Sequence, residues 1–285
     1  MFKKALATAI LLGCGLAHAF MPSNGTWVVT SELNGEPGRG LAIDAQNGTL
    51  VLQMYGYEPG SQPTFYMSSG RLSNNRFSAS LMRYRGGRYL GSGPMTGVAD
   101  RDMGQVSLRF TSGVSGFITL PGEPEVAISR FNFGYPATAD SLRGTWALTS
   151  FGSEGVRVQD GYLIRYLAPT RDGNGLMATD DGLFACEHQV RGALAGEVLC
   201  VLNNTAGQLE RSYRFVYSVN DGEGESRTYG DRPAQTLFAK RLTTPQGDRT
   251  GIVYNYSGPM DGSRTALHEQ IEKLASEAVP LTARD

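Results

Sequence analysis

The sequence is poor in the side chains on which much enzyme chemistry depends. Its 285 residues include three histidines, three cysteines and two tryptophans. His188 and His268 lie far apart, and the Gly-x-Ser-x-Gly, Walker, Cys-x-x-Cys and His-Glu-x-x-His patterns do not occur. A zinc enzyme or a His-dependent hydrolase is therefore not expected, and we predict no catalytic residue, no metal ligand and no cofactor.

An excess of charge of either sign is also missing. Lys and Arg number 26 against 27 Asp and Glu. Nucleic-acid binding needs a basic excess or a concentrated basic patch, so the balance argues against a nucleic-acid partner. With 19% charged and 40% hydrophobic residues, the composition excludes a disordered, collagen-like or coiled-coil chain.

Hydrophobic runs long enough to cross a membrane do not occur. The apolar stretch 5–17 follows Lys3 and Lys4 and leads into Ala17-His18-Ala19, but a transmembrane helix needs about 20 residues. A basic start, a short apolar run and a small-x-small site are typical of a signal peptide. We predict a signal peptide over 1–19 and a periplasmic or extracellular protein without a transmembrane segment.

The sequence Leu11-Leu12-Gly13-Cys14 allows a second interpretation of the same segment. It resembles the lipobox of bacterial lipoproteins, in which the cysteine carries the lipid. Cys14 would then be a lipid anchor. Cleaved secretion is favoured because a conventional cleavage site follows.

The two remaining cysteines, Cys186 and Cys200, flank a Gly-bracketed turn over 191–196. A hairpin centred there sets them opposite each other, and two cysteines in an oxidising compartment most often pair. Closing a loop of about 15 residues contributes about 3 kcal/mol in the chain-entropy model. The alternative is a catalytic Cys186 beside His188, which requires a reduced thiol. A disulfide is favoured.

An internal repeat divides the chain. The segment 25–31 (GTWVVTS) recurs as 144–150 (GTWALTS), with five of seven residues identical and an offset of 119. The Pro- and Ala-containing stretch 136–140 makes a natural linker before the second copy. We therefore predict repeat one over 20–139 and repeat two over 140–258.

Short alternating segments separated by Gly, Pro, Asn and Asp indicate an antiparallel β-structure. In 49–57, for example, one side carries Leu50, Leu52 and Met54 and the other carries Tyr55 and Tyr57. Repeat one has about eight such segments, the number that closes a small barrel. We predict an all-β protein with two tandem up-and-down barrels of about eight strands each.

The last predicted strand of each repeat places an arginine, Arg130 or Arg241, on its apolar side. Gly25-x-Trp27 and Gly144-x-Trp146 stand on the first strands. A Gly-x-Trp first strand with an Arg on the last strand resembles the calycin barrels, which comprise lipocalins, fatty-acid-binding proteins and avidins. The resemblance implies that each Arg packs over its Trp and closes one barrel end.

Repeat one also resembles a repeat of uncharacterised secreted proteobacterial proteins. The residues that carry this likeness are at 38–44, 55–57, 63–66 and 86–87. It supports the repeat boundaries and implies no activity. Repeat two departs from this pattern after its first strand.

The tail from 259 to 285 has a helical pattern. Leu267, Ile271, Leu274 and Ala278 recur at helical spacing after Ser263, which can cap the helix, and Pro280 ends it. We predict a C-terminal α-helix that docks on a barrel wall; the alternative is a helix that binds a partner.

Acidic loops at 172–175 and 220–225 are interpreted as solvated turns, since neither has the spacing of a known calcium loop. Aromatic residues near an arginine in repeat one form the best candidate site, because such sets suit small apolar or sugar-like ligands. Packing within strands is the alternative explanation. The predicted ligand-binding residues are Tyr55, Tyr57, Phe65, Tyr66, Arg83 and Tyr84.

The preferred functional hypothesis is a non-enzymatic binding protein of the cell envelope that holds a small apolar or sugar-like molecule. The first alternative is an adaptor or inhibitor whose barrels are filled with side chains and whose partner is an envelope protein. A carboxylate- or metal-dependent hydrolase is the third. A filled or a hollow barrel interior distinguishes the first two.

Overall fold

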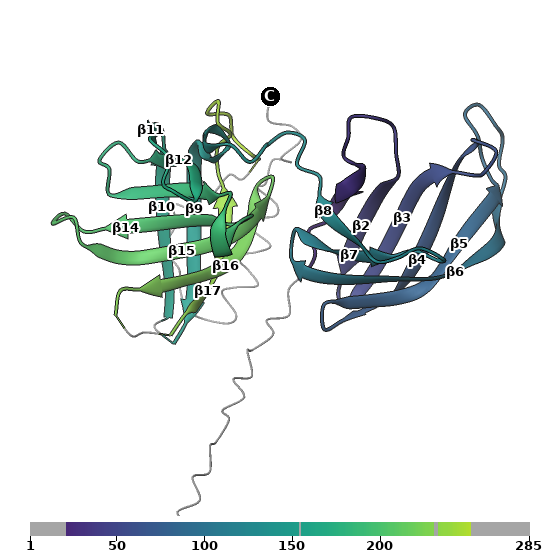
Figure 1. Ribbon diagram of the computed structural model, residues 1–285, viewed down its shortest axis with the longest axis horizontal. Coiled ribbons are helices and arrows are strands. Elements are labelled where there is room, and N and C mark those ends of the chain that lie inside the picture. The colour runs from purple at the N-terminus through teal and green to yellow at the C-terminus, as the bar shows by residue number, and fades with distance from the viewer. Residues whose placement is uncertain (1–20, 154, 231–232, 252–285) are drawn as a thin grey trace, which may run out of the picture. The chain divides into compact units, whose positions relative to one another are not determined.

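The computed structural model describes residues 21–153, 155–230 and 233–251 (Figure 1). The described chain is all-β, with strands and three short 3₁₀ helices and without an α-helix in those ranges. The predicted signal peptide, Cys14 and the predicted C-terminal helix over 259–285 lie outside the described residues.

The first strands form a closed up-and-down barrel, called barrel one here. Each strand pairs antiparallel with its chain neighbour, and β8 pairs back with β1. This confirms the predicted eight-stranded barrel for the first repeat. Its strands are β1 (Gly25–Val29), β2 (Gly40–Gln46), β3 (Thr49–Tyr57), β4 (Pro63–Ser73), β5 (Arg76–Gly86), β6 (Gly97–Ser112), β7 (Ser115–Thr119) and β8 (Val126–Arg130).

The remaining strands form a nine-stranded half-barrel, called sheet two here, in the order β10-β9-β17-β16-β15-β14-β13-β12-β11. Its strands are β9 (Gly144–Gly152), β10 (Gly155–Leu163), β11 (Arg165–Leu167), β12 (Gly173–Ala178), β13 (Phe184–Gln189), β14 (Val198–Asn203), β15 (Leu209–Ser218), β16 (Asp221–Thr228) and β17 (Gln235–Arg241). The prediction of a second closed barrel of about eight strands is therefore corrected.

The two edge strands of sheet two follow each other directly in the chain. β10 and β11 are separated by Ile164 alone, where the chain changes its partner from β9 to β12. The Ile164 amide donates to the Ala178 carbonyl at 2.9 Å. A Cβ on Gly161 would come within 2.7 Å of Phe184 Cδ1, so this glycine lets the phenyl ring lie against β10.

Strand alternation and turn residues explain the hairpins of barrel one. In β3, Leu50, Leu52 and Met54 share one side, as the sequence predicts, and this side is buried. Asn47 and Gly48 join β2 to β3 with φ of 46° and 74°. Two successive positive φ angles characterise the type I′ turn, whose twist suits a two-residue hairpin.

The interior of barrel one is filled by one cluster of apolar side chains. Trp27 and Phe110 meet edge to face at its centre, with ring centroids 5.5 Å apart. Such packing gains from both area burial and ring geometry. The largest fully buried members are Trp27, Phe77, Leu41, Ile43, Leu50, Leu52, Leu108, Ile118 and Ile128.

Both sheets pair the tryptophan of the first strand with the arginine of the last. Trp27 lies opposite Arg130 in β1 and β8, and Trp146 lies opposite Arg241 in β9 and β17. Each indole N–H donates to the carbonyl four residues earlier, at 2.9 Å in both cases. The sequence repeat is thus also a repeat of local structure.

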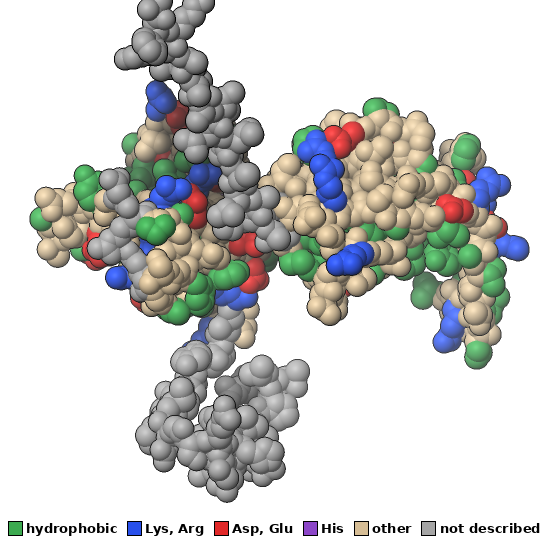
Figure 2. All heavy atoms as spheres, turned by 90° about the horizontal axis from the view of Figure 1, so that it is seen from below, with side chains coloured by type: hydrophobic (Ala, Val, Ile, Leu, Met, Phe, Trp, Pro, Cys, Tyr) green, Lys and Arg blue, Asp and Glu red, His purple; other side chains and the backbone are tan. Residues whose placement is uncertain are grey.

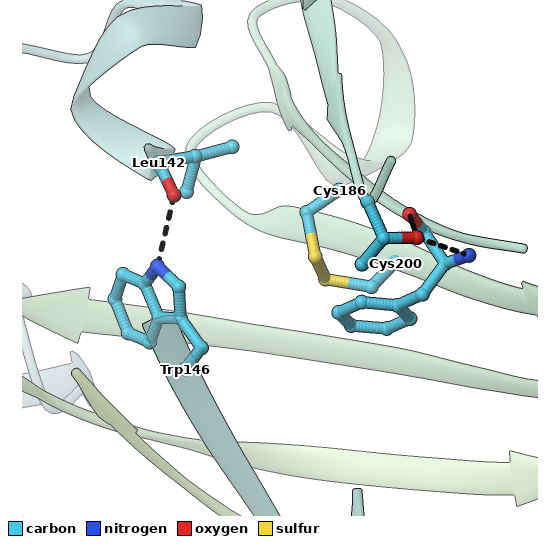
Figure 3. Close-up of a disulfide and its surroundings, with 6 residues drawn as sticks. Leu142, Trp146, Cys186 and Cys200 are labelled. Atoms are coloured by element: carbon cyan, nitrogen blue, oxygen red, sulfur yellow. Dashed lines mark hydrogen bonds between the residues drawn. A yellow bond between two sulfur atoms is a disulfide. The ribbon is translucent and has the colours of Figure 1, made fainter. Parts of the chain in front are cut away.

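Cys186 and Cys200 form the predicted disulfide (Figure 3). They are register partners in β13 and β14, and both side chains lie in the core of sheet two with Trp146. The pairing is confirmed, and it removes the thiol that a catalytic Cys186 would need.

Candidate functional site

The six predicted ligand-binding residues lie on two sides of the β3–β4–β5 wall of barrel one. Tyr55, Tyr57, Phe65 and Tyr84 point outward, whereas Tyr66 is buried on the inner side. Arg83 is the register partner of Tyr66 and shares its side. Successive residues of a strand face opposite sides, so Phe65 and Tyr66 could not act in one site.

The four outward rings form an aromatic face on adjacent strands. Tyr55 is the register partner of Phe65, and the Phe65 and Tyr84 ring planes lie within 4° of parallel with centroids 6.3 Å apart. All four side chains are between 37% and 55% exposed. Hydrophobic side chains gather over barrel one in Figure 2. A contiguous exposed apolar patch on a rigid wall marks an interaction surface.

Tyr66 and Arg83 belong to a charged network at the barrel rim. The Tyr66 hydroxyl donates to Glu58 at 3.0 Å, and Arg83 bonds Glu58 at 2.9 Å and Asp100 at 2.7 Å. The Arg83 hydrogen bond lowers the pKa of Glu58 below its ordinary value. Because Arg83 already pairs with two carboxylates, we interpret it as a structural residue of the rim. Of the two sides of the wall, the outer face is therefore the more suitable surface for ligand recognition.

The two repeat arginines are held differently. The Arg241 guanidinium lies over the Trp146 ring at 4.2 Å from its centre and is fully buried. Both guanidiniums donate to backbone carbonyls, Arg241 to Ser141 and Arg130 to Thr26, each at 2.6 Å, but Arg130 is only partly buried. The expected packing of an arginine over the tryptophan of the first strand is thus found at Arg241.

A buried polar cluster in sheet two was missed by sequence reasoning. The Ser141 hydroxyl lies 3.0 Å from His188 Nε2 and 3.0 Å from the Tyr217 hydroxyl. Ser141 comes from the 3₁₀ helix η2 (Ala139–Leu142), which covers one end of the sheet. Strand alternation places His188 on the inner side with Cys186, but nothing in the sequence brings Ser141 to it.

A serine hydroxyl next to a histidine ring nitrogen resembles a nucleophile–base pair, but the proton of the Ser141 hydroxyl does not point to His188. Ser141 Oγ donates its proton to the Thr138 carbonyl at 2.8 Å, so it accepts a hydrogen bond from the imidazole or from Tyr217. All three side chains are buried. A nucleophile must give its proton to the base and reach a substrate, so we interpret the cluster as structural.

His188 makes the stability of sheet two depend on pH. Burial, together with the charge of Arg241, lowers the pKa of His188 to about 4. In the unfolded chain the imidazole is protonated below about pH 6.5, whereas in the native state it stays neutral down to about pH 4. The free energy of unfolding therefore decreases as the pH falls from about 6.5 to about 4. We expect a loss of about 2 kcal/mol between pH 7 and pH 5.

Urea unfolding at both pH values measures this loss, and a His188→Gln variant is the control. Glutamine keeps a polar side chain but does not titrate, so its stability difference between the two pH values should be smaller by about 2 kcal/mol. An equal loss in both proteins would contradict the assignment to His188.

Glu187, on the opposite side of β13, is buried and accepts several hydrogen bonds. Its carboxylate accepts from the Thr170 amide at 3.0 Å and the Gly175 amide at 2.9 Å. Burial acts to raise its pKa, and the hydrogen bonds from Thr170, Gly175 and Gln189 outweigh burial and hold the pKa below its ordinary value. The carboxylate thus fastens the 170–175 segment to the sheet.

Metal binding finds no support in the described ranges. No group of three His, Cys, Asp or Glu side chains there is placed to hold a metal ion. In the acidic loops, Asp172 pairs with Arg171 and Asp221 pairs with Lys240. Within the same ranges no helix is long and apolar enough to cross a membrane.

Comparisons with protein-family models, with curated proteins and with solved structures find no match. The functional inference is therefore carried by the geometry of barrel one.

Proposed function

We propose that this is an exported, non-enzymatic binding protein that recognises a sugar-like ligand on the outer aromatic face of barrel one. The observation that carries the proposal is four exposed rings on adjacent strands of a barrel whose interior is filled. By that criterion barrel one does not hold a ligand in its interior, so we place recognition on the outer face, where the four rings lie. The predicted signal peptide supports export, and so does the disulfide, since disulfides persist in oxidising compartments.

The chemistry of this face suits a carbohydrate. A pyranose ring has a face of C–H groups that packs on an aromatic ring, and hydroxyls at its edge that need hydrogen-bond partners. The face provides both: rings on β3, β4 and β5, and the Tyr55 hydroxyl, which donates to Gln53 Oε1 at 3.0 Å. Tyrosine combines an apolar ring with a polar end and is therefore enriched at binding surfaces.

A pull-down of the full chain on peptidoglycan, chitin and cellulose, followed by titration with oligosaccharides of the polymer that binds, tests the proposal. Phe65→Ala removes the central ring and should weaken binding about tenfold. Phe238→Ala is the matched control, because Phe238 is an exposed aromatic residue of sheet two that packs on Phe151. Absence of binding by the wild type, or equal binding by Phe65→Ala, would overturn the proposal.

The alternative of an adaptor protein is favoured by one observation on sheet two. Phe151, Phe238, Val156 and Val158 are exposed on adjacent strands and form a second apolar face. If Phe238→Ala abolished association with an envelope protein while no polysaccharide bound the wild type, the adaptor function would replace the glycan-binding one.

A further inference from the structure

The β5–β6 hairpin extends beyond the wall of barrel one. Pairing of β5 with β4 ends at Tyr66 and Arg83, whereas its pairing with β6 continues to Gly86 and Gly97. We call residues 85–98 the finger. β5 and β6 and the loop that joins them are visible on the barrel-one side of Figure 1.

The end of the finger is a structured turn with an apolar apex. The Ser92 amide donates to the Tyr89 carbonyl at 2.9 Å, and the Tyr89 amide donates to Ser92 Oγ at 3.0 Å. Gly91, with φ of 83°, takes the third position that a type II turn reserves for glycine. Leu90 therefore stands at the second position, and its side chain is 102% exposed.

Apolar and basic side chains follow one another along the finger. Tyr89 is 71% exposed and Met95 is 51% exposed beside the apex. Arg88 and Arg85 come next, and the finger contains no acidic residue. The turn over 89–92 thus exposes Leu90 to solvent, and Arg88 and Arg85 lie next along the finger.

This order matches the layers of a bilayer surface. Aliphatic side chains belong below the headgroups, tyrosine belongs at the interface, and arginine pairs with lipid phosphate while its stem reaches along apolar surface. A protein groove would require a shape fitted to the finger, whereas a lipid surface requires an apolar end and nearby cations.

We propose that the finger docks the protein on an anionic lipid surface by inserting Leu90 and Met95 just below the lipid headgroups. Arg85 and Arg88 bind lipid phosphates. Arg85 is held near the base of the finger by Asp100 at 3.1 Å, and Arg88 is oriented by the Ser92 carbonyl at 3.2 Å. The inference does not depend on the glycan-binding function, because Phe65 lies outside the finger.

Vesicle flotation tests the proposal with the full chain carrying Cys14→Ser, so that an acyl chain cannot contribute. We expect binding to vesicles of phosphatidylglycerol and phosphatidylethanolamine, and weak binding to phosphatidylcholine. Leu90→Asp should weaken binding at least tenfold, and Arg88→Gln about fivefold. The matched control is Tyr229→Asp, because Tyr229 is also a highly exposed turn residue, in sheet two and outside the finger.

A second measurement keeps the test independent of folding defects. Leu90→Trp places an indole at the apex, and its emission should shift to the blue on phosphatidylglycerol vesicles while the buried Trp27 and Trp146 are unaffected. Phe65→Ala should bind vesicles normally, which separates this inference from the glycan proposal. Absence of vesicle binding, or an unshifted emission of the tryptophan at position 90, would overturn the lipid-docking proposal. So would a protein partner whose capture Leu90→Asp abolishes while the wild type binds no vesicles.

Discussion

Replacing Arg241 with leucine is expected to destabilise sheet two by about 3 kcal/mol. The guanidinium is fully buried and donates to the carbonyls of Arg143 at 2.9 Å and Ser141 at 2.6 Å. It also packs over the Trp146 ring. Leucine would fill part of the volume but leave the buried Ser141 carbonyl and the partly buried Arg143 carbonyl without these donors.

Urea unfolding followed by Trp146 fluorescence, in a Trp27→Phe background that leaves one indole, measures this effect in sheet two. Arg241→Lys should still cost about 2 kcal/mol, because an ammonium group cannot reproduce the planar, forked donor set. Lys240→Ala is the matched control. Lys240 is a partly exposed neighbour whose ion pair with Asp221 should be worth less than about 1 kcal/mol. Equal stabilities of the Arg241→Leu and Lys240→Ala proteins would contradict the structural role.

The parts of the fold that depend on local pattern could be predicted from the sequence. Alternation in 49–57 places Leu50 and Leu52 on one side of the strand and Tyr55 on the other, because side chains along a strand alternate with period two, and the structure has this division. The Gly-x-Trp repeat locates the first strand of each sheet. Cys186 and Cys200 are almost equally distant from the turn at 191–196, so the hairpin makes them register partners.

The open edge of sheet two could not be predicted, because it depends on which strands become neighbours. The segment 155–167 shows no break in its pattern at Ile164, yet the chain changes its pairing partner there. The sequence of 155–167 indicates a β-strand, but it does not indicate that the first part pairs with β9 and the second with β12.

The candidate site was predicted in part for a related reason. Alternation separates Phe65 from Tyr66, but it does not say which of the two faces the interior of a closed barrel. The register of β4 with β3 decides it, because Tyr66 pairs with the buried Met54 and Phe65 pairs with the exposed Tyr55. The cluster of Ser141, His188 and Tyr217 joins segments far apart in the chain and leaves no local pattern at all.

Closure explains why binding should be sought on the outer surface of this protein. Each sheet uses a Trp–Arg pair to join its first and last strands, and in barrel one the space next to Trp27 is taken by Phe110 and neighbouring aliphatic side chains. The side chains of the interior thus stabilise barrel one. The aromatic face and the finger are apolar surfaces outside this core, and they are the places where we expect binding.

The second large effect is expected at Gly173, the first residue of β12. A Cβ at this position would lie 1.8 Å from the Glu187 carboxyl carbon and 2.1 Å from each of its oxygens. The carboxylate cannot move away without losing its hydrogen bonds from Thr170 and Gly175. We expect Gly173→Ala to cost about 3 kcal/mol, and Gly60→Ala, where no atom lies within 4 Å, to change stability by less than about 0.5 kcal/mol.

A double-mutant cycle separates the steric effect from a backbone effect. Glu187→Ala alone should cost about 2 kcal/mol, because it leaves buried amide donors unpaired. It also creates the space that the new methyl group needs. If the clash with the carboxylate is the cause, the double variant should be more stable than the sum of the single effects predicts, by about 2 kcal/mol. Additive losses in urea unfolding would show instead that Gly173 is required for the backbone bulge between Gly173 and Leu176, and that Glu187 merely covers it.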